Sequence, residues 1–543
     1  MQRRSFIQMG GLASGMLLFG CRAQKVIPKK RMNILFIMDD QHRGDCIGAA
    51  GADWLNTPNL DRLAAEGALF NRAYSSTPSC LPARAAILTG LRPWNHGLLS
   101  FLAIPNKYKV EMPQLFTDAG YRTHVAGKNH FYGAKHGYQT TEVEEIFLDK
   151  DADGFYKDDY LRWLQQNHPE VLKSVTDQNF YNDHRDLAWK YAEETHPTHW
   201  TAERAKAFLR EYKGEAPWFL KFSLHRPHCP LDPPRRLVDK YLQKTLPSPA
   251  VGPWAEKAYG EAVGSMQQAP KAAIGHFPDK EIHESRAAYY ASIEYVDEKI
   301  GEVLEVLKER GELENTFILF TSDHGDMMGD NYRWQKCCPY EPSARVPMLI
   351  RWPAAMNLPV RRGQQFDHLV ELRDIMPTFL DAAGLPVPGN IDGKSMVQIL
   401  RDSACPWRDT LEIEHGSQYF SEDAYVALTD KRYKYIYFTQ TGDQQLFDLK
   451  KDPKELNNIT DPVLLAAWRK RMVAFLSERG EEWVKNGDLV LQTRRMLYSP
   501  NFKKNMLEPA DEQVEKRFNP STEPPTLKEY IRQLGYSGKF TGV

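Results

Sequence analysis

The sequence lacks an excess of charge of either sign. Its 543 residues include 70 Lys and Arg against 71 Asp and Glu, a formal net charge of -1 at pH 7. Nucleic-acid binding needs clustered basic side chains against the phosphates, so this balance disfavours a nucleic-acid partner. An anionic small substrate is not excluded, because a local cationic pocket binds an anion without a basic surface.

Cysteine is scarce as well. The chain has seven cysteines, an odd and scattered set that does not indicate a disulfide framework. We therefore expect no structural disulfides. Adjacent Cys337 and Cys338 are compatible with a vicinal pair, but two thiols in a pocket wall are the preferred interpretation. The sequence also contains no internal repeats.

No segment after the N-terminus reaches the ~20 apolar residues of a membrane-spanning helix. At the N-terminus, Arg3-Arg4 precede an apolar stretch from Met9 to Phe19, a pattern typical of a twin-arginine export signal. The stretch ends at Cys21 in a sequence that resembles a bacterial lipobox, although Phe19 is bulky for that motif. A cleaved signal with an incidental cysteine is the alternative. Residues 1–21 are thus expected to be an export or lipoprotein signal, placing the protein in the periplasm or lipid-anchored to the bacterial envelope.

Short apolar runs alternate with helical patterns over most of the chain. This alternation predicts an α/β fold, with a large, mainly parallel sheet sandwiched by helices. After about residue 420, Ala424 to Leu428 and Tyr433 to Phe438 alternate as antiparallel strands do. We expect a catalytic domain over 22–420 and a small C-terminal α+β subdomain with an antiparallel sheet and a wrapping tail over 421–543. The strand candidates of the large sheet are Asn33 to Met38, Tyr121 to Ala126, Trp218 to Leu224, Thr316 to Ser322 and Pro347 to Trp352.

Polar clusters follow four of these apolar runs. They begin at Asp39, Gly127, His225 and Asp323. In open α/β sheets ligands bind beyond the carboxyl ends of the strands, so these clusters are expected to converge on one site.

A motif between the first two strand candidates indicates which reaction the protein catalyses. Cys80-Leu81-Pro82-Ala83-Arg84 resembles the formylglycine signature of type I sulfatases, although alone it also fits an ordinary helix start with a first-turn proline. Other motifs follow the order seen in that family: Met38-Asp39-Asp40-Gln41, Gly127-Lys128-Asn129-His130, His225-Arg226-Pro227-His228, Ser322-Asp323-His324-Gly325, and Lys336 followed by Tyr340-Glu341-Pro342-Ser343-Ala344-Arg345. The chain is therefore identified as a member of the type I sulfatases, in the alkaline phosphatase superfamily, and the resemblance spans most of its length.

The resemblance implies a sulfuric ester hydrolase with two cofactors. Cys80 would be oxidised to formylglycine (3-oxoalanine) by a maturation enzyme, and its hydrate would attack sulfur and then expel sulfate by collapsing to the aldehyde. One calcium ion would be held by Asp39, Asp40, Asp323 and the converted Cys80, with His324 as a further ligand. Carboxylate oxygens suit this hard ion, whereas an imidazole matches it poorly.

The remaining motif residues are implied to handle the sulfuryl group and its protons. Arg84 would lie next to the hydrate, and Lys128 and Lys336 would bind sulfate oxygens. His130 is a candidate base for the collapse step and His225 the general acid toward the leaving alcohol. The last of these residues, His228, would support the substrate.

The substrate and two alternatives stay open. An exported enzyme makes a sulfated glycan plausible, with contacts from the insertion between Lys128 and Trp218, which includes Asn182, His184, Arg185, Trp189 and Trp200. A phosphonate monoester or phosphodiester hydrolase of the same superfamily is the nearest rival, because those relatives can share formylglycine. A non-catalytic glycan-binding protein is the other, if Cys80 stays a thiol.

Overall fold

The computed structural model describes residues 31–177, 181–518 and 523–536. The chain divides into two units, Met1–Arg31 and Met32–Val543, and every element named below belongs to the second. The predicted export signal over residues 1–21, with Cys21, lies outside the described residues. Among the described residues no helix combines the length and apolar character needed to cross a membrane.

An eight-stranded sheet forms the centre of the fold, in the order β11-β2-β10-β8-β1-β7-β5-β6. β1 pairs in parallel with β7 and β8, and β5 pairs in parallel with β7, while β10 runs antiparallel to β8 and β2. The predicted α/β fold with a mainly parallel sheet is confirmed, and five strands lie where the apolar runs predicted them. The strands are β1 (Asn33–Asp40), β2 (Ala68–Phe70), β5 (Arg122–Gly127), β6 (Thr140–Glu142), β7 (Trp218–Pro227), β8 (Thr316–Ser322), β10 (Met348–Arg351) and β11 (Gln364–Phe366).

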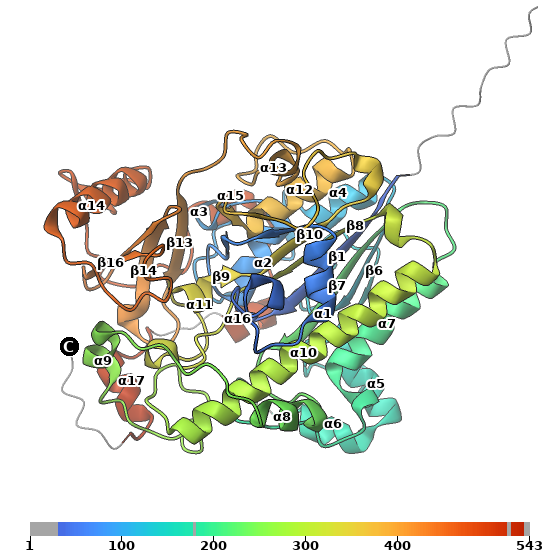
Figure 1. Cartoon of the computed structure of the whole chain (residues 1–543), viewed down its shortest axis with the longest axis horizontal. Helices are drawn as coiled ribbons and strands as arrows, with labels where there is room; N and C mark the ends of the chain where they lie inside the picture. The colour runs from blue at the N-terminus through green and yellow to red at the C-terminus, as the bar shows by residue number, and fades with distance from the viewer. Residues whose placement is uncertain (1–30, 178–180, 519–522, 537–543) are drawn as a thin grey trace, which may run out of the picture. The chain divides into compact units, whose positions relative to one another are not determined.

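Helices cover both faces of this sheet (Figure 1). Successive side chains of a strand point to opposite faces, so Leu35 and Ile37 of β1 enter one core while Ile34 and Phe36 enter the other. Because both faces are covered, the central strands are continuous apolar runs rather than alternating ones. The first core includes α1 (Pro58–Ala65), α7 (Pro197–Glu211) and α10 (Asp279–Glu309); the second includes α2 (Cys80–Thr89), α4 (Met112–Asp118), α12 (Ile375–Ala382) and α13 (Val397–Arg401).

A four-stranded antiparallel sheet follows in the C-terminal part, and α14 (Pro462–Ser477) packs on it (Figure 1). Its first strand lies before residue 421, where the composition was expected to change. That strand has charged side chains inside it: Glu412 pairs with Arg373, and Glu414 pairs with Arg479. These buried ion pairs let a strand with two glutamates fold into the interior. The strands are β13 (Leu411–Gly416), β14 (Ala424–Thr429), β15 (Tyr433–Phe438) and β16 (Gln444–Asp448).

Smaller elements connect these layers. Three strands form a short second sheet, β12-β3-β9, and other helices lie along the edges of the fold. Those bounds are β3 (Ala73–Tyr74), β9 (Arg345–Val346), β12 (Val370–Glu371), α5 (Asp159–Asn167), α6 (Pro169–Val175), α8 (Arg235–Leu242), α9 (Pro253–Tyr259), α16 (Glu512–Phe518) and α17 (Leu527–Gln533).

Candidate active site

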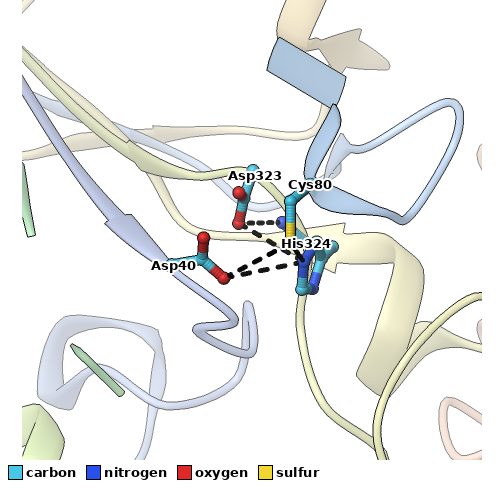
Figure 2. Close-up of side chains that lie close together, drawn as sticks. All are labelled: Asp40, Cys80, Asp323 and His324. Carbon is cyan, nitrogen blue, oxygen red and sulfur yellow. Dashed lines mark hydrogen bonds and ion pairs between the residues drawn. The ribbon is translucent and has the colours of Figure 1, made fainter. Parts of the chain in front are cut away.

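Four predicted site residues from three elements meet at the carboxyl ends of the central strands (Figure 2). Asp40 ends β1, Cys80 begins α2, and Asp323 and His324 follow β8. One potential metal-ligand atom from each lies within 4.8 Å of the others, and all four residues are buried. The expected convergence of sequence-distant strand ends is therefore present in the structure.

Cys80 lies at the centre of this cluster. Its Sγ is 3.1 Å from His324 Nε2, and Lys336 Nζ donates to it over 3.2 Å. Burial and the nearby Asp40 carboxylate raise the pKa of the Cys80 thiol to about 12. The thiolate is the reactive form of cysteine, so the unmodified side chain is a poor nucleophile at neutral pH.

Arg84 lies one helical turn after Cys80 and joins three strand ends. Its Nε donates to Asp323 Oδ2 and its Nη2 to Asp40 Oδ2, both over 2.9 Å, and its Nη1 donates to the carbonyl oxygen of Lys128 over 2.8 Å. Arg84 was predicted to lie next to the hydrate of the converted Cys80, and its hydrogen bonds in the structure go to Asp323, Asp40 and the backbone of Lys128. Its guanidinium faces carboxylates, so it organises the anionic side of the site.

Lys128 completes the pairing of Asp40. Its Nζ lies 2.9 Å from Asp40 Oδ2, and both side chains are fully buried. Burial by itself would raise the pKa of Asp40, but Lys128, His228, Arg84 and Lys336 outweigh burial and hold that pKa well below its usual range. Asp40 is therefore a buried anion surrounded by cationic side chains.

The backbone before Lys128 requires glycine. Gly127 has a φ of 96°, and a Cβ there would lie 2.0 Å from the carbonyl oxygen of Ser223 on β7. The absence of a side chain lets the end of β5 approach β7, where Lys128 N donates to that same oxygen over 2.8 Å. The glycine thereby places Lys128 beside Asp40.

Asp39 has a different environment from Asp40. Its Oδ2 lies 2.6 Å from His42 Nδ1, and Asp39 is not in the compact group of potential ligand atoms. Its other oxygen, Oδ1, is buried and has no hydrogen-bond partner among the described residues. An unpartnered buried carboxylate oxygen is costly, so this atom fits a site that takes a cation.

Lys336 has a supporting network that the sequence did not reveal. Its Nζ donates to Gln41 Oε1 and lies 2.8 Å from both that oxygen and His228 Nε2. Gln41 Nε2 in turn donates to Asp326, whose Oδ2 lies 3.1 Å from His184 Nε2. Thus His184, expected to contact substrate or to be structural, is buried beneath Lys336 in this network.

The other histidines also meet at the site. His225 Nδ1 lies 2.9 Å from Glu144 Oε1, and burial together with Lys128 holds the pKa of His225 well below its usual range. The backbone N–H of His130 donates to Glu145. The Tyr181 ring centroid lies 5.6 Å from that of His228 and 6.4 Å from that of His225. Sequence reasoning missed Glu144 and Tyr181, because neither belongs to a motif.

Comparison with known proteins shows the family of this chain. The sulfatase family profile matches residues 32–385, and a profile for the C-terminal part of N-sulphoglucosamine sulphohydrolase matches residues 329–481. The chain is 39% identical to an arylsulfatase of Clostridium perfringens over 438 residues, 79% of this chain and 90% of that protein. The chain belongs to the sulfatase family.

Two further known proteins are similar to this sulfatase. It is 27% identical to an N-acetylglucosamine-6-O-sulfatase of Bacteroides thetaiotaomicron, over 86% of this chain and 90% of that protein. The structure is similar to that of a phosphonate monoester hydrolase of Agrobacterium radiobacter, with a TM-score of 0.68 and 26% identity, over 82% of this chain and 96% of that one. Membership of the sulfatase family gives this chain the alkaline-phosphatase-like fold and the activity of a sulfuric ester hydrolase.

Two glycine substitutions test the geometry before Lys128. Gly133→Ala, at a φ of 102° with no atom within 4 Å of the added Cβ, should lower the free energy of unfolding by about 1–2 kcal/mol through backbone strain alone. Gly127→Ala adds a collision with Ser223 and should cost more than about 3 kcal/mol, since the backbone must move. Denaturant unfolding measures both, and equal losses would contradict the close approach of β5 and β7.

Proposed function

We propose that this sulfatase removes sulfate from a sulfated glycan, using formylglycine formed from Cys80 and one bound calcium ion. The placement of Cys80 carries the proposal. It begins α2 beside Asp40, Asp323, His324 and Lys336, in a buried site where its thiol is protonated. A cysteine that is central to a charged site but unreactive as a thiol needs the conversion to take part in catalysis.

In the proposed reaction, the converted Cys80 would supply the nucleophile, and a calcium ion held by the site carboxylates would supply Lewis-acid chemistry. The side chains of the protein bind and orient the ester. The ammonium groups of Lys128 and Lys336 bind sulfuryl oxygens, where negative charge accumulates. Arg84 holds Asp40 and Asp323 in place.

Two histidines move protons in this scheme. His225 would donate a proton to the departing alcohol oxygen, and His130 would accept a proton when sulfate is released. The unpartnered ring atoms, Nε2 of His225 and Nδ1 of His130, are free for these transfers among the described residues. His228, 2.8 Å from Lys336 Nζ, supports the sulfate-binding side.

The chain offers a fitting donor set for calcium. Asp40 and Asp323 contribute carboxylates to the compact group, and Asp39 has its unpartnered Oδ1. Hard oxygen donors are those that calcium prefers. The proposed ligands are Asp39, Asp40, Asp323, His324 and the converted Cys80.

The glycan substrate is supported by the N-acetylglucosamine-6-O-sulfatase relative, while the phosphonate monoester hydrolase similarity supports the nearest rival. Turnover of an aryl sulfate and of an aryl phosphodiester, measured with the same preparation, distinguishes a sulfatase from a phosphonate monoester or phosphodiester hydrolase. We expect sulfate turnover to exceed phosphodiester turnover. The reverse ranking would favour the rival, and binding of a sulfated glycan with no turnover of either ester would favour the non-catalytic alternative.

Replacement of Cys80 tests the nucleophile. Cys80→Ala should fold and lose essentially all sulfatase activity, because it removes the convertible side chain but keeps a small residue at the helix start. Cys80→Ser is the matched variant, since serine is nearly the same size and is oxidised only by some maturation systems. Wild-type turnover by the alanine variant would refute the mechanism.

Calcium dependence tests the ligands. Chelation should abolish activity and lower the melting temperature, and calcium should restore both, because a metal that binds only the folded state stabilises it. Asp323→Asn should lose the calcium-dependent shift. Asp423→Asn is the control, since Asp423 is also a buried carboxylate paired with an arginine, Arg333. Loss of the calcium shift in the control, or its persistence in Asp323→Asn, would contradict the assignment.

We also propose export of a matured enzyme. The support is the Arg3-Arg4 pattern and the motif ending at Cys21. Twin-arginine export carries folded proteins, so a maturation enzyme would act on Cys80 in the cytoplasm first. Replacing Arg3-Arg4 with Lys-Lys should leave active enzyme inside the cell, and Cys21→Ala should release exported enzyme from the membrane. Cell fractionation with activity assays checks both variants. An unchanged distribution of activity among the cell fractions would contradict the predicted export signal and lipid anchor.

A further inference from the structure

A buried carboxyl group is paired with the proposed general acid. His225, near the end of β7, has its Nδ1 2.9 Å from Glu144 Oε1, and both side chains are fully buried. The second carboxyl oxygen of Glu144 and Nε2 of His225 have no hydrogen-bond partners among the described residues. The pair is therefore isolated, with one imidazole nitrogen bound to Glu144 and the other available to a substrate.

Charges around the pair disfavour an imidazolium–carboxylate arrangement. Lys128, Arg226 and His228 face His225, and Asp40 only partly offsets them, so burial and these neighbours together lower the pKa of His225. Asp158 and Glu145 are the carboxyl groups near Glu144. Burial and these carboxylates raise the pKa of Glu144 well above its usual range against the opposing effect of Arg226 and Lys128.

We propose that Glu144 positions His225 and supplies a proton to Nδ1 as His225 delivers its Nε2 proton to the leaving alcohol. In the resting pair, the neutral Glu144 carboxyl group donates to Nδ1, and the neutral imidazole carries its proton on Nε2. That proton is offered to the ester oxygen without an imidazolium having to form beside the cations Lys128 and Arg226. The inference rests on the proposed function, because it needs His225 to be the general acid.

The transfer is balanced in atoms and electrons. The nucleophile at residue 80 forms a bond to sulfur as the bond between sulfur and the ester oxygen breaks, and the electron pair of the broken bond goes to the ester oxygen, which takes the proton from Nε2. Nδ1 takes the proton of Glu144 at the same time. The products are the neutral alcohol, a neutral imidazole protonated at Nδ1 and a Glu144 carboxylate. The resting pair is restored when Nε2 takes a proton from solvent and the Nδ1 proton returns to Glu144.

Glu144→Gln separates proton supply from positioning. Glutamine keeps the size of the side chain, and its amide N–H can still donate to Nδ1, so the imidazole keeps its orientation, but the amide has no proton to give up. On aryl sulfates of rising leaving-phenol pKa, we expect near wild-type kcat/KM for the best leaving group and a loss of ~10²–10⁴-fold for the poorest.

The matched control is Glu142→Gln. Glu142 lies two residues earlier, on β6, and also pairs with a histidine, His124, over 3.4 Å, but that pair is away from the site. This variant should show the wild-type leaving-group dependence. His225→Ala is the reference and should steepen the dependence at least as much as Glu144→Gln.

The outcomes distinguish this inference from the proposed function. A steep His225→Ala series beside a wild-type or uniformly lowered Glu144→Gln series would overturn the relay and leave the general acid in place. A His225→Ala series without steepening would overturn the general acid and the relay together. Whatever the result for Glu144 and His225, Cys80→Ala should lose activity equally on all of these aryl sulfates. Retained activity in that variant would instead contradict the assignment of the nucleophile.

A measurement on the wild-type enzyme covers the case in which Glu144→Gln does not fold. With the poorest leaving group, kcat/KM is measured in mixtures of light and heavy water. Two protons moving in one transition state give a curved dependence on the deuterium fraction, whereas one proton gives a straight line. We expect curvature, and a straight line would overturn the relay.

Discussion

The site depends on the buried guanidinium of Arg84. It contacts Asp40, Asp323 and the carbonyl oxygen of Lys128, and so joins the ends of β1, β8 and β5 to the helix that carries Cys80. Two carboxylates so close together in a dry site would otherwise repel each other and favour protonation. Removing one partner of such a buried pair typically costs 3–5 kcal/mol. The geometry of the site and part of its stability thus rest on one side chain.

Charge balance around Arg84 explains the rest of the arrangement. Arg84, Lys128 and Lys336 are three buried cations, and Asp39, Asp40 and Asp323 are three carboxylates. A calcium ion with an anionic ester would add charges of both signs to this balanced set. Near His225 itself, burial and the cations Lys128 and Arg226 disfavour a charged imidazole, which is why the proton source matters for the leaving group.

The strand ends were predictable because the reacting residues directly follow apolar runs. Asp40, Lys128, His225 and Asp323 all converge as those runs predicted. Their partners were not predictable. Glu144 reaches His225 across 81 positions of sequence, and nothing local distinguishes it from Glu142 or Glu145. Contacts between loops depend on the folded backbone rather than on a motif.

Two local conformations were also not predicted from the sequence. Gln41 has a φ of 72°, in the left-handed region that non-glycine residues rarely adopt, and it contacts Lys336 at a separation of 295 positions. Asp39 and Asp40 are adjacent and alike in sequence, yet only Asp40 joins Cys80, while Asp39 pairs with His42. Successive side chains at a strand end diverge, so residue type alone did not separate their environments.

The central claim is that Cys80 is converted. Mass spectrometry of the proteolytic peptide across Cys80, from protein matured in its own host, tests this claim most directly. The account predicts the mass of the aldehyde or its hydrate on that residue. A peptide carrying only the unmodified thiol, isolated from protein that hydrolyses sulfate esters, would contradict it.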